Sequence, residues 1–282
     1  MVAALYDIVQ HVDADLGLRL FLRTAKAYCV PVPADQYDRL LQLRDELAYH
    51  YSVIHQGLNV QWPPLDPGDR ALRSGRFGLA MLGAMFDSHS YYGDATPQQM
   101  VDRLLHADNG LVPGIQAAVL LDDVQRLIDS PMPDRVLTDP WRAISGRYHV
   151  DDAPDITGRP WLREIAGRCR TRLLDVDPTY APYPAPVQEG PKAAVLYEIQ
   201  ACRTVLESPR GAVTNGPGPA LEQAATTISP DLAFRLFLQI LMECEHTVTT
   251  EQFARYTRLG QQLGYHDDYV EGHEKLLNGH VN

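Results

Sequence analysis

Hydrophobic and polar residues recur along most of this chain with the period of an amphipathic helix. The stretch 34–55 shows the pattern, because its apolar residues are spaced to form one buried face: Tyr37, Leu40, Leu41, Leu47 and Ala48. Alternating runs of β-branched residues, which indicate strands, are nearly absent. The pattern therefore predicts an all-α protein, with helices packed as a multi-helix bundle or a short solenoid.

Capping residues and prolines predict where several helices begin and end. Thr96–Pro97 and Asp139–Pro140 each place an N-cap residue before a proline at the first helical position. Pro160 is expected in the first turn of another helix, and Pro131 is expected to end one. Further helices are predicted in four stretches: 4–11, 13–29, 34–55 and 70–86.

A proline-rich segment predicts the domain boundary. Residues 175–192 carry five prolines, a spacing that favours an extended, semi-rigid backbone. We therefore expect an N-terminal helical lobe at 1–175, a linker at 176–191 and a C-terminal helical lobe at 192–282. The segment also fits a ligand for an SH3-like domain, although a spacer is the favoured interpretation.

The chain repeats one helical sequence near its two ends. The stretch "DLGLRLFL" at 15–22 returns as "DLAFRLFL" at 231–238, and the likeness continues without a gap to His50 and His266. The sequence "TTEQ" at 249–252 predicts a capping box between Thr249 and Gln252, and it aligns with "PADQ" in the first copy. We predict an internal duplication, with repeat unit 1 at 4–56 and repeat unit 2 within the C-terminal lobe. A third, degenerate unit near 117–131 is left open.

The paired arginines of the repeat interrupt otherwise apolar helices. Arg19 and Arg235 stand among leucine and phenylalanine residues that would make each helix apolar on most sides. We expect each arginine to pair with a carboxylate or to cap a helix end.

Charge and cysteine usage narrow the classes of function. The formal charge is −11, with 36 acidic and 25 basic residues, which argues against non-specific binding of nucleic acid and leaves a basic protein partner open. The four cysteines form no C-x-x-C pair, which argues against a zinc knuckle. No apolar stretch is long enough for a membrane span and no signal peptide is evident, so we expect a cytoplasmic protein.

Histidine and acidic residues gather near the C-terminus. The stretch "GYHDDYVEGHEK" at 264–275 places Asp267, Asp268 and Glu271 close on one helical turn, as candidate binding residues. His266 followed by Asp267 resembles the central dipeptide of HD-type metal phosphohydrolases, which are also all-α. That resemblance implies a hydrolase that uses His246, His266 and Asp267 as metal ligands, with His149 as a further candidate, but the later aspartate of that fold is missing.

Two loops supply further candidates. In "DSHSYYGD" at 87–94, His89, Tyr91 and Tyr92 suit a contact surface, because aromatic side chains bury a large area with few rotors. The acidic stretch 148–155 is interpreted as a solvated loop, since it lacks the spacing of a calcium loop. No phosphate-binding loop or nucleophile elbow stands out, so no catalytic residue and no cofactor are assigned.

The stretch 248–272 resembles the terminal helical hairpin of immunity-type proteins from bacterial polymorphic toxin systems. The likeness is carried by "VTTEQ", by the run from Leu259 to Gly264, and by "DDYVEG". It implies a non-enzymatic protein of bacterial type that binds a toxin, commonly through an acidic face. We therefore expect a non-catalytic α-helical protein-binding module. The alternatives are a metal-dependent HD-like hydrolase and a structural or phage-assembly protein, and the oligomeric state is left open.

Overall fold

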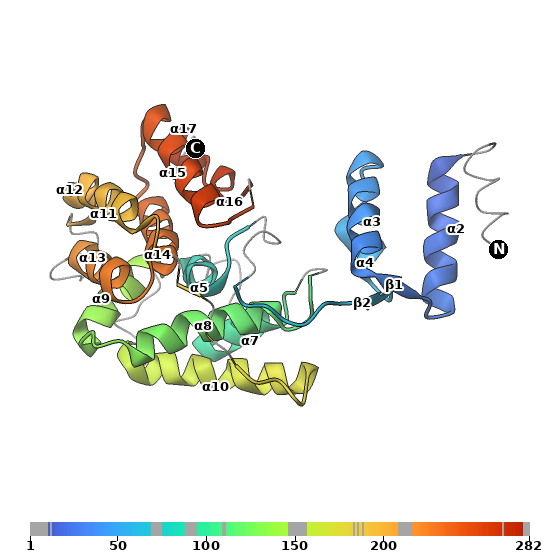
Figure 1. Ribbon diagram of the computed structural model, residues 1–282, viewed down its shortest axis with the longest axis horizontal. Helices are drawn as coiled ribbons and strands as arrows, with labels where there is room; N and C mark the ends of the chain where they lie inside the picture. The colour runs from blue at the N-terminus through green and yellow to red at the C-terminus, as the bar shows by residue number, and fades with distance from the viewer. Residues whose placement is uncertain are drawn as a thin grey trace. The chain divides into compact units, whose positions relative to one another are not determined.

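The chain is predominantly helical, as predicted, with one short pair of strands in the part that the structure describes (Figure 1). This computed structural model describes residues 11, 13–68, 75–87, 95–108, 111–145, 157–182, 184, 186–187, 189–207, 216–266 and 268–278. The expected helix at 4–11 therefore lies almost wholly outside the described residues. Within them, no helix is both long and apolar enough to cross a membrane.

The chain divides into two compact units near residue 65. Unit 1 comprises residues 1–65 and 108–113, and unit 2 comprises residues 66–107 and 114–282. The expected boundary was the proline-rich segment 176–191, but the helices on both sides of that segment belong to unit 2. The structure thus places the division near residue 65 and not at the prolines.

Unit 1 is a small helical unit that also contains a pair of short parallel strands. Its elements are α2 (Ala14–Ala27), β1 (Pro31–Pro33), α3 (Ala34–Glu46), α4 (Tyr51–His55) and β2 (Asn59–Gln61). The strands pair in parallel, with Val32 opposite Val60. Its core consists of six buried side chains: Leu18, Leu22, Val32, Tyr37, Leu40 and Ile54.

The single helix predicted over 34–55 is two helices. α3 ends at Glu46, and Ala48 takes a left-handed conformation with φ at 54°. The amide of Tyr49 then bonds the carbonyl of Arg44 at 3.0 Å, which closes the helix end. The prediction of one continuous helix was wrong, because the spacing of apolar residues does not reveal that a single residue takes a left-handed conformation and ends the helix.

The first half of unit 2 packs five helices together. They are α5 (Gly78–Asp87), α7 (Pro97–Leu105), α8 (Ile115–Asp129), α9 (Asp134–Ile144) and α10 (Gly158–Val176). The long helices α8 and α10 lie side by side, as Figure 1 shows in green and yellow. α7 begins with the predicted N-cap: Thr96 precedes Pro97 and forms a complete capping box with Gln99.

The predicted start of α9 was wrong. The helix begins at Asp134, after Pro133, so Pro140 lies inside it rather than at its first position. Asp139 is therefore an interior residue and not an N-cap. Pro140 lies at the end of the second turn, where it removes one backbone donor from the helix. An aspartate followed by a proline looks the same in the sequence whether it starts a helix or lies within one.

The second half of unit 2 surrounds one buried helix. Its helices are α11 (Lys192–Ala201), α12 (Arg203–Leu206), α13 (Gly218–Thr227), α14 (Pro230–Glu243), α15 (Thr250–Gln262), α16 (Asp268–Glu271) and α17 (Lys275–Asn278). Every residue of α14 from Pro230 to Met242 is buried. This helix repeats the sequence of α2, in which only four residues are buried.

The two related segments make the same helix ends at a constant spacing of 216 residues, the distance from Asp15 to Asp231. α2 is followed by Cys29 with φ at 48°, and α14 is followed by Glu245 with φ at 51°. In both, the next amide bonds a carbonyl five residues back: Val30 to Ala25 at 2.9 Å, and His246 to Leu241 at 3.0 Å. Both ends are Schellman-type caps.

The correspondence continues into the strands of unit 1. Val32 pairs with Val60 across the parallel strands. At the same spacing in unit 2, the amide of Val248 bonds the carbonyl of Leu276 at 2.8 Å. The local geometry of the two segments thus agrees at these positions, and their common origin by duplication stays a prediction.

A buried ion network links α14 to α5 and α8. Arg235 donates to both oxygens of Asp123, at 2.7 and 2.6 Å, and to Asp231 at 2.8 Å. The hydroxyl of Tyr265 donates to Asp231 at 2.7 Å, and the amide of Leu79 donates to Asp123 at 2.9 Å. Burial opposes the charge of Arg235, but the two carboxylates raise its pKa well above the usual value. The predicted carboxylate partner of Arg235 is confirmed.

Candidate functional site

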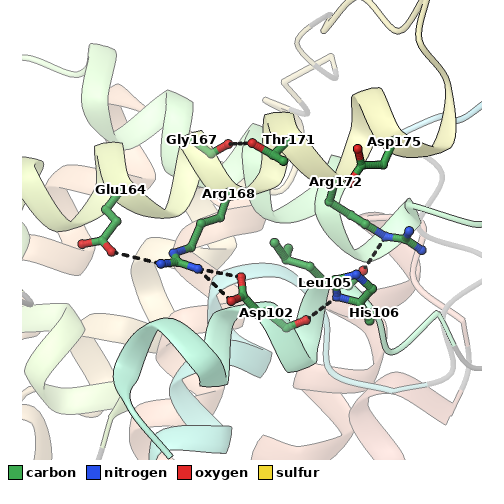
Figure 2. A pocket seen from close by; sticks show the side chains of 9 residues that line it. All are labelled: Asp102, Leu105, His106, Glu164, Gly167, Arg168, Thr171, Arg172 and Asp175. Carbon is green, nitrogen blue, oxygen red and sulfur yellow. Dashed lines mark hydrogen bonds and ion pairs between the residues drawn. The ribbon is translucent and has the colours of Figure 1, made fainter.

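A groove bordered by charged residues lies between α7 and α10 in unit 2 (Figure 2). It has a volume of about 400 Å³, and its lining residues are Asp102, Leu105, His106, Glu164, Gly167, Arg168, Thr171, Arg172 and Asp175. α10 contributes residues three, four and seven positions apart, which lie on one face of a helix. The groove therefore follows a single face of α10 where it passes the end of α7.

Arg168 holds the centre of the groove. Its Nη1 atom donates to both carboxylate oxygens of Asp102, at 2.8 and 2.7 Å. Its Nη2 atom lies 3.6 Å from Glu164, one turn earlier on α10. Figure 2 shows the guanidinium lying between the two carboxylates. Because these side chains are partly exposed, the pairs contribute modestly to stability and leave charge accessible at the surface.

The end of α7 forms the other part of the groove. The Nδ1 atom of His106 lies 2.7 Å from the backbone oxygen of Asp102, and the Nε atom of Arg172 donates to the backbone oxygen of Leu105 at 3.3 Å. The guanidinium of Arg172 is favoured there, because the last carbonyls of a helix carry partial negative charge. Both side chains are thus held at the helix end (Figure 2).

The groove is equipped for recognition of charged groups. Two guanidinium groups and three carboxylates line it. A charged group of another molecule can therefore form an ion pair here in exchange for one of the pairs within the groove. Thr171 carries the one hydroxyl among the lining residues, and it donates to the backbone oxygen of Gly167 at 3.2 Å. Among the described contacts, the hydrogen bond of Thr171 is to this backbone oxygen and not to a basic side chain.

The groove was not among the predicted sites. Its residues come from two helices that are about sixty positions apart in the chain, and no local motif joins them. The available signal was the i,i+4 series Glu164, Arg168 and Arg172, which predicts a charged helix face but gives no sign of the partner helix.

The C-terminal candidates lie on the surface of unit 2. Asp268 and Glu271 are the exposed ends of the one-turn helix α16. The Nδ1 atom of His266 accepts the amide of Asp268 at 3.2 Å and lies 3.3 Å from its carboxylate. His266 thus acts as a local cap for α16. Asp267 lies outside the described residues.

The metal-ligand alternative finds no supporting cluster in the described part of the chain. No three histidine, cysteine, aspartate or glutamate residues gather there as a metal site requires. His246 is half-buried just after α14, and burial lowers its pKa. His89, Tyr91 and Tyr92 lie outside the described residues, as does the whole acidic stretch 148–155 with His149.

Comparisons of the chain with protein-family models, with curated proteins and with solved structures found no match.

Proposed function

We propose that this chain is a non-catalytic α-helical module that acts by binding another protein. The observation that supports the proposal is the outer face of α2 in unit 1. Leu16 is 36% exposed and Leu20 is half-buried, whereas the corresponding Leu232 and Leu236 on α14 are fully buried. Apolar side chains that are enclosed in α14 and accessible at the corresponding positions of α2 support a contact surface on α2.

The face is formed by residues one helical turn apart. Leu16, Arg19, Leu20 and Arg23 follow the i, i+3, i+4, i+7 spacing and therefore share one side of α2. We call these four residues the α2 face. It combines apolar area with two guanidinium groups, and arginine is enriched at the centres of protein interfaces.

The experiment is capture of a partner by the intact chain from the organism that encodes it. Wild-type protein is compared with Leu16→Glu/Leu20→Glu, which places two charges on the α2 face. Leu174→Glu is the matched control, because Leu174 is also an exposed leucine, 50% accessible, but belongs to unit 2. We expect wild type and the control to retain one partner at fixed stoichiometry in size-exclusion chromatography with light scattering, and the double variant to lose it.

Two outcomes would contradict the proposal. A wild-type chain that elutes alone under all conditions argues against a binding function. Loss of the partner by Leu174→Glu, with no effect of the double variant, would assign binding to unit 2 instead of α2.

The narrower form of the proposal is an immunity- or antitoxin-like protein of a bacterium. It rests on the resemblance of 248–272 to immunity-type proteins and on the formal charge of −11, which favours a basic toxin domain as partner. Co-expression with a toxin encoded by a neighbouring gene tests it directly. Growth rescued by the wild-type chain is the expected result, and unrelieved toxicity would contradict this form alone.

A further inference from the structure

We propose that the α2 face recognises a helical protein that presents a carboxylate to Arg19, as α8 presents Asp123 to Arg235. The inference rests on the proposed binding function and adds the chemistry of the partner. It is carried by the correspondence between two sites of the same chain, one filled and one open.

The local arrangement around the two arginines is the same. Arg19 pairs with Asp15 at 2.5 Å, and Tyr49 donates its hydroxyl to the same carboxylate. At a spacing of 216 residues, Arg235 pairs with Asp231 at 2.8 Å, and Tyr265 donates its hydroxyl to that carboxylate. Each arginine is therefore held in place from within its own unit by an aspartate and a tyrosine.

In unit 2, the outward side of this arrangement is filled. Asp123 receives both Nη atoms of Arg235, and the ring of Phe77 lies 4.6 Å from the guanidinium carbon. The start of α5 closes the site, because a Cβ added at Gly78 would come within 2.0 Å of Asp123 and 2.9 Å of Arg235. A helix start and an aspartate from a second helix together make the site complete.

In unit 1, the outward side of the arrangement is open. The side chain of Arg19 is 58% exposed, whereas that of Arg235 is fully buried. Asp15 is its one ion-pair partner among the described residues. Among the described residues, Arg19 therefore has one carboxylate partner where Arg235 has two, and its guanidinium retains donors for a bidentate pair.

The surroundings favour a helical surface that is apolar and carries a local carboxylate, whatever the net charge of the whole partner. Leu16 and Leu20 flank Arg19, and their counterparts on α14 are buried against neighbouring helices. Arg23 adds a second positive charge one turn away, where α14 has the neutral Gln239. A partner that covers these leucines excludes water from Arg19, whose pair with Asp15 uses only part of the donors of the guanidinium. A carboxylate on the partner would satisfy the remaining donors, as Asp123 does for Arg235.

The experiment uses a defined pair of probes on the intact chain. The first is a synthetic alanine- and glutamine-based helical peptide of about 16 residues whose leucine stripe is interrupted by one aspartate. The second is identical except for asparagine at that position. Binding to wild type, Arg19→Gln and Arg39→Gln is measured by fluorescence anisotropy. Arg39 is the matched control, as an exposed arginine of unit 1 that lies on α3.

We expect wild type and Arg39→Gln to bind the aspartate peptide about tenfold more tightly than the asparagine peptide. Arg19→Gln is expected to bind both peptides equally. Circular dichroism checks that this variant keeps its helices, as expected for a change at an exposed side chain.

Equal binding of the two peptides by wild type would overturn the inference. So would discrimination that survives Arg19→Gln, or no binding of either peptide, the result expected if another part of this chain covers α2. These failures leave the proposed function standing if a host partner is still captured through the leucines. Conversely, selective peptide binding with no host partner would retain the chemistry of the surface and remove the proposed function.

Discussion

At the scale of single residues, this protein uses unusual backbone and burial at a few positions. Cys29, Ala48 and Glu245 are non-glycine residues with positive φ, and each closes a helix. His273 is buried although histidine is polar, and its ring nitrogen lies 3.0 Å from the backbone oxygen of Tyr269. Each of these positions carries a conformational or desolvation cost that a substitution can measure.

Ala48→Gly is expected to stabilise unit 1 by about 0.5–1 kcal/mol, because glycine avoids the steric cost of a Cβ at φ near 54°. The corresponding position of unit 2 already holds glycine, Gly264, with φ at 74°. Hydrogen exchange of the α3 amides reports the change. Ala27→Gly is the control and should destabilise by a similar amount, because Ala27 is a helical residue of α2. A loss of protection in Ala48→Gly would contradict the expectation.

His273 is expected to make stability depend on pH between about 6.5 and 4. Burial, assisted by Arg76, lowers the pKa of His273 to about 4, whereas the unfolded chain binds the proton near pH 6.5. The unfolded state then holds more protons in this range. The contribution of neutral His273, about 3 kcal/mol, is present above pH 6.5 and is lost as the pH falls to 4.

Urea unfolding of His273→Gln at several pH values tests this expectation. The variant should show a shallower loss of unfolding free energy from pH 6.5 to 4, by the contribution of one proton. A slope equal to that of wild type would show that another group is responsible.

At the scale of elements, one helical sequence serves two environments. α14 is buried along its whole length, whereas α2 is buried on one face. Both helices nevertheless start at an N-cap residue that accepts the amide three residues later, and both are followed by a left-handed residue. Capping is a local property, so the two helices agree in it. Burial depends on the neighbouring helices, and unit 2 supplies α5, α9 and α13 around α14.

Asp123→Asn is expected to destabilise unit 2 by about 3 kcal/mol, because Arg235 would remain buried with one carboxylate in place of two. Asp134→Asn is the matched control. Asp134 pairs with Arg159 but is 57% exposed, so the change should cost about 1 kcal/mol or less. Thermal unfolding followed by circular dichroism compares them, and equal losses would remove the special role of the buried network.

At the scale of the whole molecule, the chain is two helical units of unequal size. Most of the buried apolar side chains belong to unit 2, and unit 1 has a core of six buried residues. Stability therefore differs between the units, because the free energy of unfolding follows the apolar area removed from water.

Hydrogen exchange of the intact chain tests this difference. The amides of α14 are expected to exchange at least about a hundredfold more slowly than those of α2, because buried neighbours surround α14 on every side. Addition of a captured partner should slow exchange in α2 and leave α14 unchanged. Equal protection of the two helices in the free chain would contradict the inequality of the units.

The sequence was sufficient for the helical class, for the N-cap at Thr96, for the capping box at Thr249, and for the expectation that each arginine pairs with a carboxylate or caps a helix end. These features depend on contacts within one or two turns, or on a charge that burial must neutralise. It was not sufficient for the groove at Arg168, since Asp102 and Arg168 belong to different helices and no periodic pattern joins them.

The sequence alone determined that two segments, 15–50 and 231–266, are similar in sequence and form similar helices that begin and end in the same way. What only the tertiary structure decided is that one arginine became the buried centre of an ion network while the other stayed accessible. The reason is that helices of similar sequence acquire different burial from different neighbours. The positions of Phe77, Gly78 and Asp123 around Arg235 follow from the packing of α5 and α8.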